Sequence, residues 1–121
     1  MTDTQASAGI RKDAGFTDFV YSVLDEKRAE DIVWLDVRGV TDIADDFMIA
    51  TITSPRQGTA ILDACETERK QRGLGRLGVE GEQGSSWMLL DYGDLVIHLF
   101  MPEQREYYAL EHIWADAKRV K

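Results

Sequence analysis

The sequence predicts a single mixed α/β (α+β) domain in which helices pack against one mixed β-sheet. The chain has 121 residues, of which 44% are hydrophobic, and this is enough apolar material for one core. Apolar residues recur at helical spacing in some segments and form short β-rich runs in others. The resulting order is helix, strand, strand, helix, weak strand, strand, strand, helix. Such an order is typical of one mixed sheet with helices packed on it.

The N-terminal segment differs in composition from the rest of the chain. Residues 1–15 are mostly small or polar and show no hydrophobic periodicity, so we expect a flexible lead-in there and the folded domain at residues 16–121. From Phe16 onward, apolar residues follow the spacing of one helical face, which predicts a helix that fades at residues 28–30. The sequence contains no apolar run of signal-peptide or membrane-spanning length, so we expect a cytoplasmic protein.

The next elements are two strands and a helix. Residues 32–37 and 46–52 are short β-rich runs, which predicts two buried, neighbouring strands joined by a tight connection. Ser54 then suits the N-cap of a helix and Pro55 its first position. Gly73 marks the predicted end of that helix.

The C-terminal half contains the clearest hairpin. A glycine-rich loop with a brief edge strand at residues 77–80 leads to two strand-like runs, residues 86–91 and 95–100. We expect them to be joined through Tyr92-Gly93, with glycine adopting a positive φ. Apolar residues at helical spacing then predict a closing helix over residues 103–114.

Strand alternation divides the first hairpin strand into two faces. Trp87, Leu89 and Asp91 point to one side, and Met88 and Leu90 to the other, together with Tyr92. Both sets of side chains are buried only if both faces of the sheet are covered. Because aromatic residues and methionine anchor protein interfaces, one of these faces is a candidate contact surface.

Charge and cysteine content exclude several classes of protein. Acidic residues outnumber basic residues by 22 to 14, for a net charge of −8, which opposes nonspecific binding to phosphate backbones. The single cysteine, Cys65, allows neither an internal disulfide nor a cysteine-based zinc site. Its place on the apolar face of a helix favours core packing over a nucleophilic role.

Three groups of residues could carry chemistry, and each has a structural interpretation that we favour. Asp91 and Asp94 could bind a metal or act as an acid/base pair with His98, but Asp and Gly are also the preferred residues of hairpin turns. His98 is better explained as a structural histidine whose ring nitrogens find partners. The basic cluster at residues 69–76 could contact RNA, but it also suits the C-terminal end of a helix. No phosphate-binding loop is present, so we expect no cofactor, no metal and no catalytic site.

Six ordered blocks of the sequence resemble the Iojap-like ribosomal silencing factors, over roughly residues 16–117. The blocks are residues 31–37 (DIVWLDV), 43–51 (IADDFMIAT), 53–57 (TSPRQ), 78–81 (GVEG), 87–98 (WMLLDYGDLVIH) and 107–114 (YYALEHIW). Several blocks in order over most of a short chain are more specific than any single motif. The departures are Pro55, where a serine is usual, and Ile52, where glycine is common, and neither lies in the hairpin.

The resemblance implies a nucleotidyltransferase-like fold without a transferase active site. It also implies a translation repressor that binds large-subunit ribosomal protein number fourteen and sterically blocks joining of the small subunit. On this hypothesis, apolar anchors on the hairpin and acidic residues around them form the docking surface. The expected contact residues are Trp87, Leu89, Asp91, Asp94, Met101, Glu103, Glu106, Tyr108 and Glu111.

Three further possibilities follow from the sequence. One is a nucleotidyltransferase-like enzyme that uses Asp91, Asp94 and His98, and another is an RNA-binding ribosome assembly factor that uses Arg69–Arg76. A hydrophobic docking face could also pair with a second copy of the chain, so a homodimer is expected when no ribosome is present.

Overall fold

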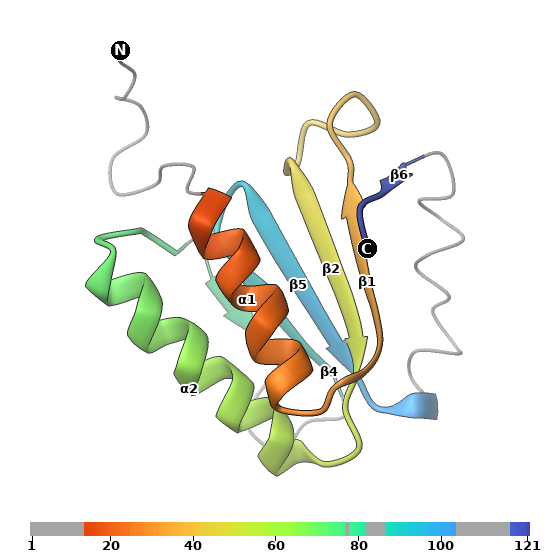
Figure 1. The fold of residues 1–121 in the computed structure, drawn as a ribbon, viewed down its shortest axis with the longest axis vertical. Helices are drawn as coiled ribbons and strands as arrows, with labels where there is room; N and C mark the ends of the chain where they lie inside the picture. Colours follow the sequence, from red (N-terminus) through yellow and green to blue (C-terminus); the bar gives the residue numbers. More distant parts are fainter. Residues whose placement is uncertain (1–13, 77, 82–86, 104–116) are drawn as a thin grey trace.

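The computed structural model describes residues 14–76, 78–81, 87–103 and 117–121 (Figure 1). These residues form two helices and six strands in the order α1 (Ala14–Glu26), β1 (Glu30–Asp36), β2 (Asp46–Thr51), α2 (Pro55–Gln71), β3 (Gly78–Glu80), β4 (Trp87–Asp91), β5 (Leu95–Phe100) and β6 (Lys118–Arg119). The strands belong to one sheet with the spatial order β3-β4-β5-β2-β1-β6. In this sheet β2 and β5 run parallel, and the remaining neighbours are antiparallel. The predicted fold class, one mixed sheet with helices packed on it, is confirmed.

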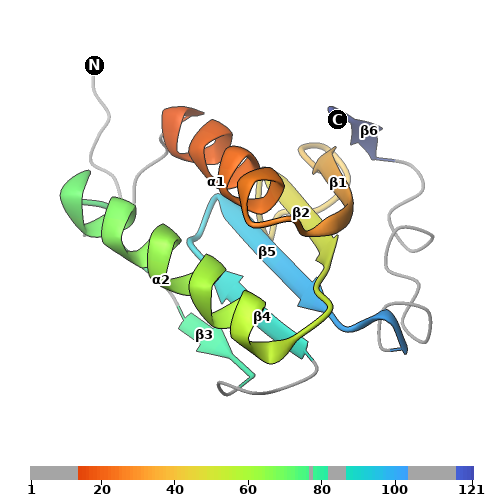
Figure 2. The ribbon, with the colours of Figure 1, turned by 60° about the horizontal axis from the view of Figure 1, so that its bottom comes forward.

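Both helices cover the same face of the sheet and run in opposite directions, as Figures 1 and 2 show. Helix α2 begins as the sequence predicts, because the Ser54 side-chain oxygen accepts a hydrogen bond from the Gln57 amide at 3.2 Å and Pro55 occupies the first helical position. Gly73 follows the helix with a φ of 70°, a conformation that glycine adopts without steric cost. None of the described helices is long and apolar enough to cross a membrane.

The sheet separates two hydrophobic clusters. We call the cluster beneath α1 and α2 the helix-side cluster, and it includes Val20, Leu24, Met48, Ile61 and Leu99 among its fully buried members. The cluster on the opposite face we call the second-face cluster, and it consists of Val33, Leu35, Val37, Ala44, Phe47, Ile49, Val96 and Phe100. Strands β1, β2 and β5 contribute to both clusters, which explains why they read as nearly continuous apolar runs.

The structure corrects two details of the predicted hairpin and sheet. The Tyr92 amide donates to the Leu95 carbonyl at 2.9 Å, so the two-residue turn is Gly93–Asp94, one residue later than predicted. Gly93 has a φ of 90°, as expected for glycine in this turn. Strand β6 was not predicted, because a two-residue Lys-Arg segment carries no strand pattern. The predicted closing helix at residues 103–114 lies, beyond residue 103, outside the described residues.

Candidate protein-docking site

Strand β4 presents two unequal faces. Met88 and Leu90 are fully buried in the helix-side cluster, whereas Trp87, Leu89 and Asp91 are only half-buried on the opposite face. This alternation is the one that the sequence predicts. We call the surface formed by Trp87, Leu89 and Asp91 the β4 face.

The side chains of the β4 face rest on the second-face cluster. The indole of Trp87 stacks on the ring of Phe100 with 6.4 Å between ring centroids and 22° between planes. Leu89 lies directly opposite His98 on the neighbouring strand β5. Trp87 and Leu89 both pack against the second-face cluster while keeping part of their surface exposed. The arrangement therefore offers large apolar side chains to a partner in fixed positions, which lowers the entropic cost of binding.

His98 is buried beneath the β4 face, and the prediction for its ring nitrogens is wrong. Its ring lies between Phe47, at 5.4 Å edge to face, and Phe100, at 6.0 Å and nearly parallel. Within the described structure neither ring nitrogen has a hydrogen-bond partner. Burial in this apolar environment lowers the pKa of His98 to about 4, because the charged form loses hydration that nothing replaces. The sequence could not reveal this, since an isolated histidine in an apolar strand does not specify its neighbours.

Asp91 and Asp94 serve the hairpin turn. A carboxylate oxygen of Asp91 accepts a hydrogen bond from the Gly93 amide at 2.9 Å, which is the pattern of an aspartate-stabilised turn. The Asp94 carbonyl accepts hydrogen bonds from the amides of Asp45 and Asp46, each at 2.9 Å. Among the described residues, no group of three or more His, Cys, Asp or Glu side chains could hold a metal ion. The hydrogen bond from Gly93 confirms the turn interpretation for Asp91, and the described contacts do not join His98 to either aspartate.

Of the remaining predicted contact residues, the structure describes only Met101 and Glu103. Met101 is half-buried, but it packs against the helix-side cluster and so does not join Trp87 and Leu89. Glu103 is exposed. The predicted contacts at Glu106, Tyr108 and Glu111 lie outside the described residues.

The three arginines of the basic cluster at residues 69–76 pair with carboxylates of α2. Arg69 and Arg76 both donate to Glu66, at 2.8 and 2.6 Å, and Arg72 pairs with Glu68 at 2.8 Å. The Tyr92 hydroxyl also donates to Glu66, at 2.7 Å, and thereby ties α2 to the end of β4. Because these arginines have intramolecular acidic partners, they are poorly placed to bind RNA phosphates. The sequence gives no sign of the role of Glu66, whose three partners, Arg69, Arg76 and Tyr92, lie up to 26 positions away.

Opposing effects act on the pKa of the Glu66 carboxyl group. Burial raises the pKa of the Glu66 carboxyl, but the hydrogen bonds from Arg69 and Tyr92 and the charges of Arg69 and Arg76 outweigh it, and the net shift is downward. Next to it, Cys65 is fully buried, as predicted, and burial together with the Glu66 charge raises its pKa to about 12. A thiol with such a pKa does not act as a nucleophile near neutral pH.

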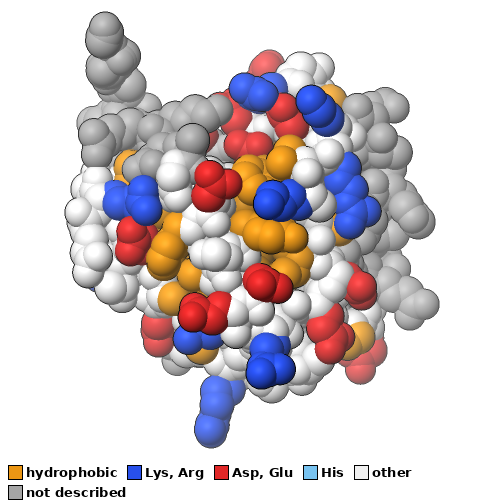
Figure 3. Space-filling view, viewed as in Figure 1, with side chains coloured by type: hydrophobic (Ala, Val, Ile, Leu, Met, Phe, Trp, Pro, Cys, Tyr) orange, Lys and Arg blue, Asp and Glu red, His pale blue; other side chains and the backbone are white. Residues whose placement is uncertain are grey.

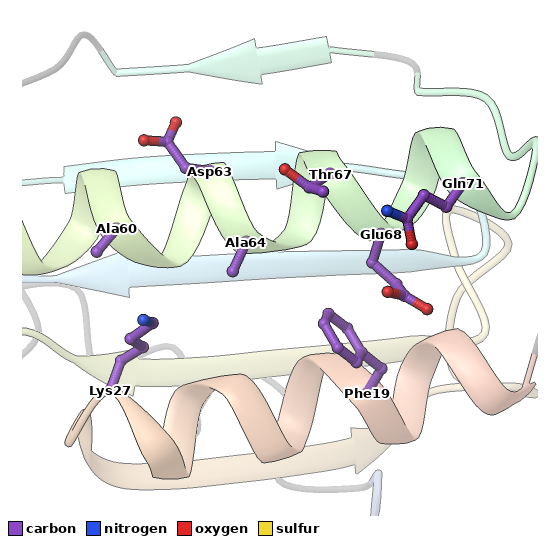
Figure 4. A pocket seen from close by; sticks show the side chains of 8 residues that line it. All are labelled: Phe19, Lys27, Ala60, Asp63, Ala64, Thr67, Glu68 and Gln71. Atoms are coloured by element: carbon purple, nitrogen blue, oxygen red, sulfur yellow. The ribbon is translucent and has the colours of Figure 1, made fainter.

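The helix side offers a different surface. An open groove between α1 and α2 is lined by Phe19, Lys27, Ala60, Asp63, Ala64, Thr67, Glu68 and Gln71 (Figure 4). Its lining combines the apolar residues Phe19, Ala60 and Ala64 with charged residues of both signs, Lys27, Asp63 and Glu68. Figure 3, which views this side, shows acidic and basic side chains interspersed, with hydrophobic side chains visible between them. The described residues on this side therefore form no continuous basic surface of the kind that binds nucleic acid.

Comparisons with known proteins place the chain in a family. The model of the family "Ribosomal silencing factor during starvation" matches residues 13–121. Ribosomal silencing factor RsfS of Haemophilus influenzae is 39% identical over 98 residues, which span 81% of this chain and 96% of the relative. Mitochondrial assembly of ribosomal large subunit protein 1 of Mus musculus is 34% identical over 100 residues, spanning 80% of this chain and 44% of the longer relative.

A solved structure agrees with the sequence comparison. The crystal structure of a protein from Chromobacterium violaceum superposes with a TM-score of 0.79 and 28% sequence identity, covering 87% of this chain and 88% of that one. The family match extends over nearly the whole chain, and the fold is shared with a relative solved by crystallography. The chain therefore belongs to the family of ribosomal silencing factors.

Proposed function

We propose that this protein represses translation by binding the large ribosomal subunit through the β4 face and obstructing the approach of the small subunit. The direct partner is large-subunit ribosomal protein number fourteen. The observation that carries the proposal is the partly exposed pair Trp87 and Leu89, of which Trp87 stacks on the buried ring of Phe100. Large, rigid apolar side chains at the centre of a contact supply most of the binding energy in protein interfaces.

Charge supports a protein partner. The net charge of −8 repels phosphate backbones and accelerates encounter with a basic protein surface. On the β4 face, Asp91 lies two residues from Leu89 and on the same side of the strand, so a carboxylate stands next to the apolar anchors. A basic ribosomal protein would meet both an apolar contact and a complementary charge.

The proposed action is steric and uses no chemical step. Of the candidate acid/base residues of the hairpin, Asp91 stabilises the turn and His98 lies buried in apolar surroundings, which supports a binding role over catalysis. The names of the relatives point the same way, since one is a ribosomal silencing factor and another is named for assembly of the ribosomal large subunit. An interface on the order of 1,200–2,000 Å² would be sufficient for specific binding.

Binding to isolated components tests the identity of the partner. We expect the purified chain to cosediment with large subunits and to bind purified ribosomal protein number fourteen, and we expect large subunits depleted of that protein to lose the chain. Equal binding to depleted and complete large subunits would reject the named partner. Absence of cosedimentation with complete large subunits would reject the proposed function as a whole.

A further inference from the structure

The loop between β1 and β2 carries the most exposed large hydrophobic side chain in the described part of the protein. Ile43 is 67% exposed and Val40 is 41% exposed, and in the described residues only Val120, at 43%, is comparable. We call residues 38–45 the Ile43 loop. Single exposed apolar residues are common on protein surfaces, so exposure alone carries no inference. Two further features of this loop favour a role for the exposed Ile43 side chain in binding.

The first feature is that the Ile43 loop is held by hydrogen bonds along its length. The Val37 amide donates to the Asp45 carbonyl at 2.9 Å and closes the base of the loop, while the amides of Val40 and Thr41 both donate to the Val37 carbonyl. The Ile43 amide donates to the Thr41 hydroxyl oxygen at 3.2 Å. The chain around Ile43 is therefore ordered before any partner binds. Its binding costs less conformational entropy than the binding of a loop that becomes ordered only in the complex.

The second feature is continuity with the β4 face. The Asp94 carbonyl in the β4–β5 turn accepts the amides of Asp45 and Asp46, which fixes the loop against that turn. Ala44, the neighbour of Ile43, is buried in the second-face cluster, against which Trp87 and Leu89 also pack. The strand from Trp87 to Asp91 extends over about 13 Å, so a partner of ordinary size that covers it can also reach the adjacent loop.

Charge defines the chemistry of the surface around Ile43. The exposed Asp42 precedes it, and the half-buried Asp45 and Asp94 lie on the side of the hairpin turn. The one cation of the loop, Arg38, is paired with Asp36 at 2.6 Å. The apolar side chain of Ile43 therefore has an exposed carboxylate, that of Asp42, as its neighbour. Such a surface repels phosphate and is complementary to an apolar pocket bordered by lysines or arginines.

We propose that the Ile43 loop is a second contact of the same docking surface, and that Ile43 inserts into an apolar pocket with a basic rim on a protein of the large subunit. This inference rests on the proposed function and extends the contact from β4 to the β1–β2 loop. The loop contributes affinity through Ile43, while the exposed carboxylate of Asp42 favours a basic protein surface over RNA.

Substitution of the exposed residues tests the contact. The full-length Ile43→Ser variant should bind purified large subunits about tenfold or more weakly than the wild type, as truncation of an interface anchor does. Val120→Ser is the matched control, because Val120 is exposed but lies outside the loop, and its affinity should stay within about twofold. If Ile43→Ser binds like the wild type while Trp87→Ala is weakened, the Ile43 contact is rejected and the proposed function stands. If the wild type itself does not bind, both fail.

Crosslinking identifies what Ile43 touches. Because Cys65 is fully buried and its pKa is raised to about 12, an Ile43→Cys variant can be labelled selectively with a benzophenone maleimide. Irradiation of the labelled chain bound to large subunits should give a crosslink to a ribosomal protein. A crosslink only to ribosomal RNA, or none at all in a complex that still forms, would overturn the proposal. Labelled Val120→Cys controls for crosslinking by proximity alone.

Discussion

The partly exposed indole of Trp87 stacks on the ring of Phe100, which is 98% buried, with 6.4 Å between their centroids. One ring of the pair belongs to the core and the other to the surface. The core ring fixes the position of the surface ring, so Trp87 is available for a contact without being flexible. This relationship separates two effects of mutation, because changes at Trp87 act first on binding and changes at Phe100 act first on folding.

Replacement of Trp87 by alanine should therefore weaken binding more than it weakens the fold. We expect a loss of about 2 kcal/mol or more in the free energy of binding to large subunits, measured by titration with fluorescently labelled protein. Phe19→Ala is the control, because Phe19 is half-buried in the helix groove on the other side of the sheet. Unchanged affinity of a folded Trp87→Ala variant would remove this residue from the interface.

His98 should make the folded state sensitive to mild acid. Its pKa is lowered from 6.5 to about 4 in the folded state, so the unfolded chain binds more protons between these values and stability falls as the pH drops through them. Above pH 6.5 the free energy of unfolding should be roughly 3 kcal/mol higher than it is below pH 4 on account of this residue, and the difference is lost as the pH falls from 6.5 to 4. Urea denaturation at a series of pH values measures it.

The His98→Leu variant isolates this contribution. It removes the titrating group and two buried nitrogens without described partners, so its stability at pH 7 should equal or exceed that of the wild type. Its free energy of unfolding should also vary less between pH 6.5 and 4. A variant with the same pH dependence as the wild type would assign the acid sensitivity to other groups.

The hydroxyl of Tyr92 should stabilise the junction between α2 and the hairpin. Tyr92→Phe removes the 2.7 Å hydrogen bond to Glu66, and we expect a loss of about 1 kcal/mol in thermal or chemical denaturation. Because the folded pKa of Glu66 is lowered, the contribution of its carboxylate is present above the ordinary value of 4.5 and is lost as the pH falls below it.

Two comparisons check the role of this hydrogen bond. Tyr21→Phe should change stability little, since the structure describes no hydrogen bond from the Tyr21 hydroxyl. In a double-mutant cycle, Tyr92→Phe should have a smaller effect when Glu66 is already replaced by glutamine. Independent, additive effects would show that the two side chains do not act as a pair.

Gly81 should be intolerant of any side chain. It adopts a φ of 82°, and a Cβ atom added there would lie 2.1 Å from the Trp87 carbonyl oxygen. Gly81→Ala should destabilise the protein by about 1–3 kcal/mol or more and should disturb the position of Trp87. Gly78→Ala is the matched control in the same segment, because a Cβ atom there meets nothing within 4 Å. Equal stability of the two variants would contradict this geometry.

Local signals were sufficient to predict most elements. The Ser54 cap and Pro55 place the start of α2, and the alternation in residues 87–91 assigns Met88 and Leu90 to the core and Trp87 and Leu89 to the other face. These features depend on spacing along the chain, which the sequence states directly. The turn was predicted one residue early, because Tyr92 and Gly93 are both compatible with a turn and only the Tyr92–Leu95 hydrogen bond decides between them.

Features that depend on distant neighbours could not be predicted from the sequence. The partners of Glu66, the unpartnered nitrogens of His98 and the contact of the Ile43 loop with Asp94 each join separate elements. Ile43 lies in one of the blocks that carry the family resemblance, but it was not predicted as a contact, because exposure in a loop cannot be inferred from hydrophobicity. Met101 was grouped with Trp87 on the basis of residue type, whereas the structure places it against the helix-side cluster.

Subunit joining is the most direct test of the central claim. Large subunits incubated with the purified chain and then mixed with small subunits should show reduced light scattering and a smaller peak of complete ribosomes on sucrose gradients, and the Trp87→Ala variant should restore both. Normal subunit joining, measured while saturating wild-type protein is bound to the large subunit, would contradict the account. A bound protein that leaves subunit joining unchanged cannot repress translation by steric obstruction.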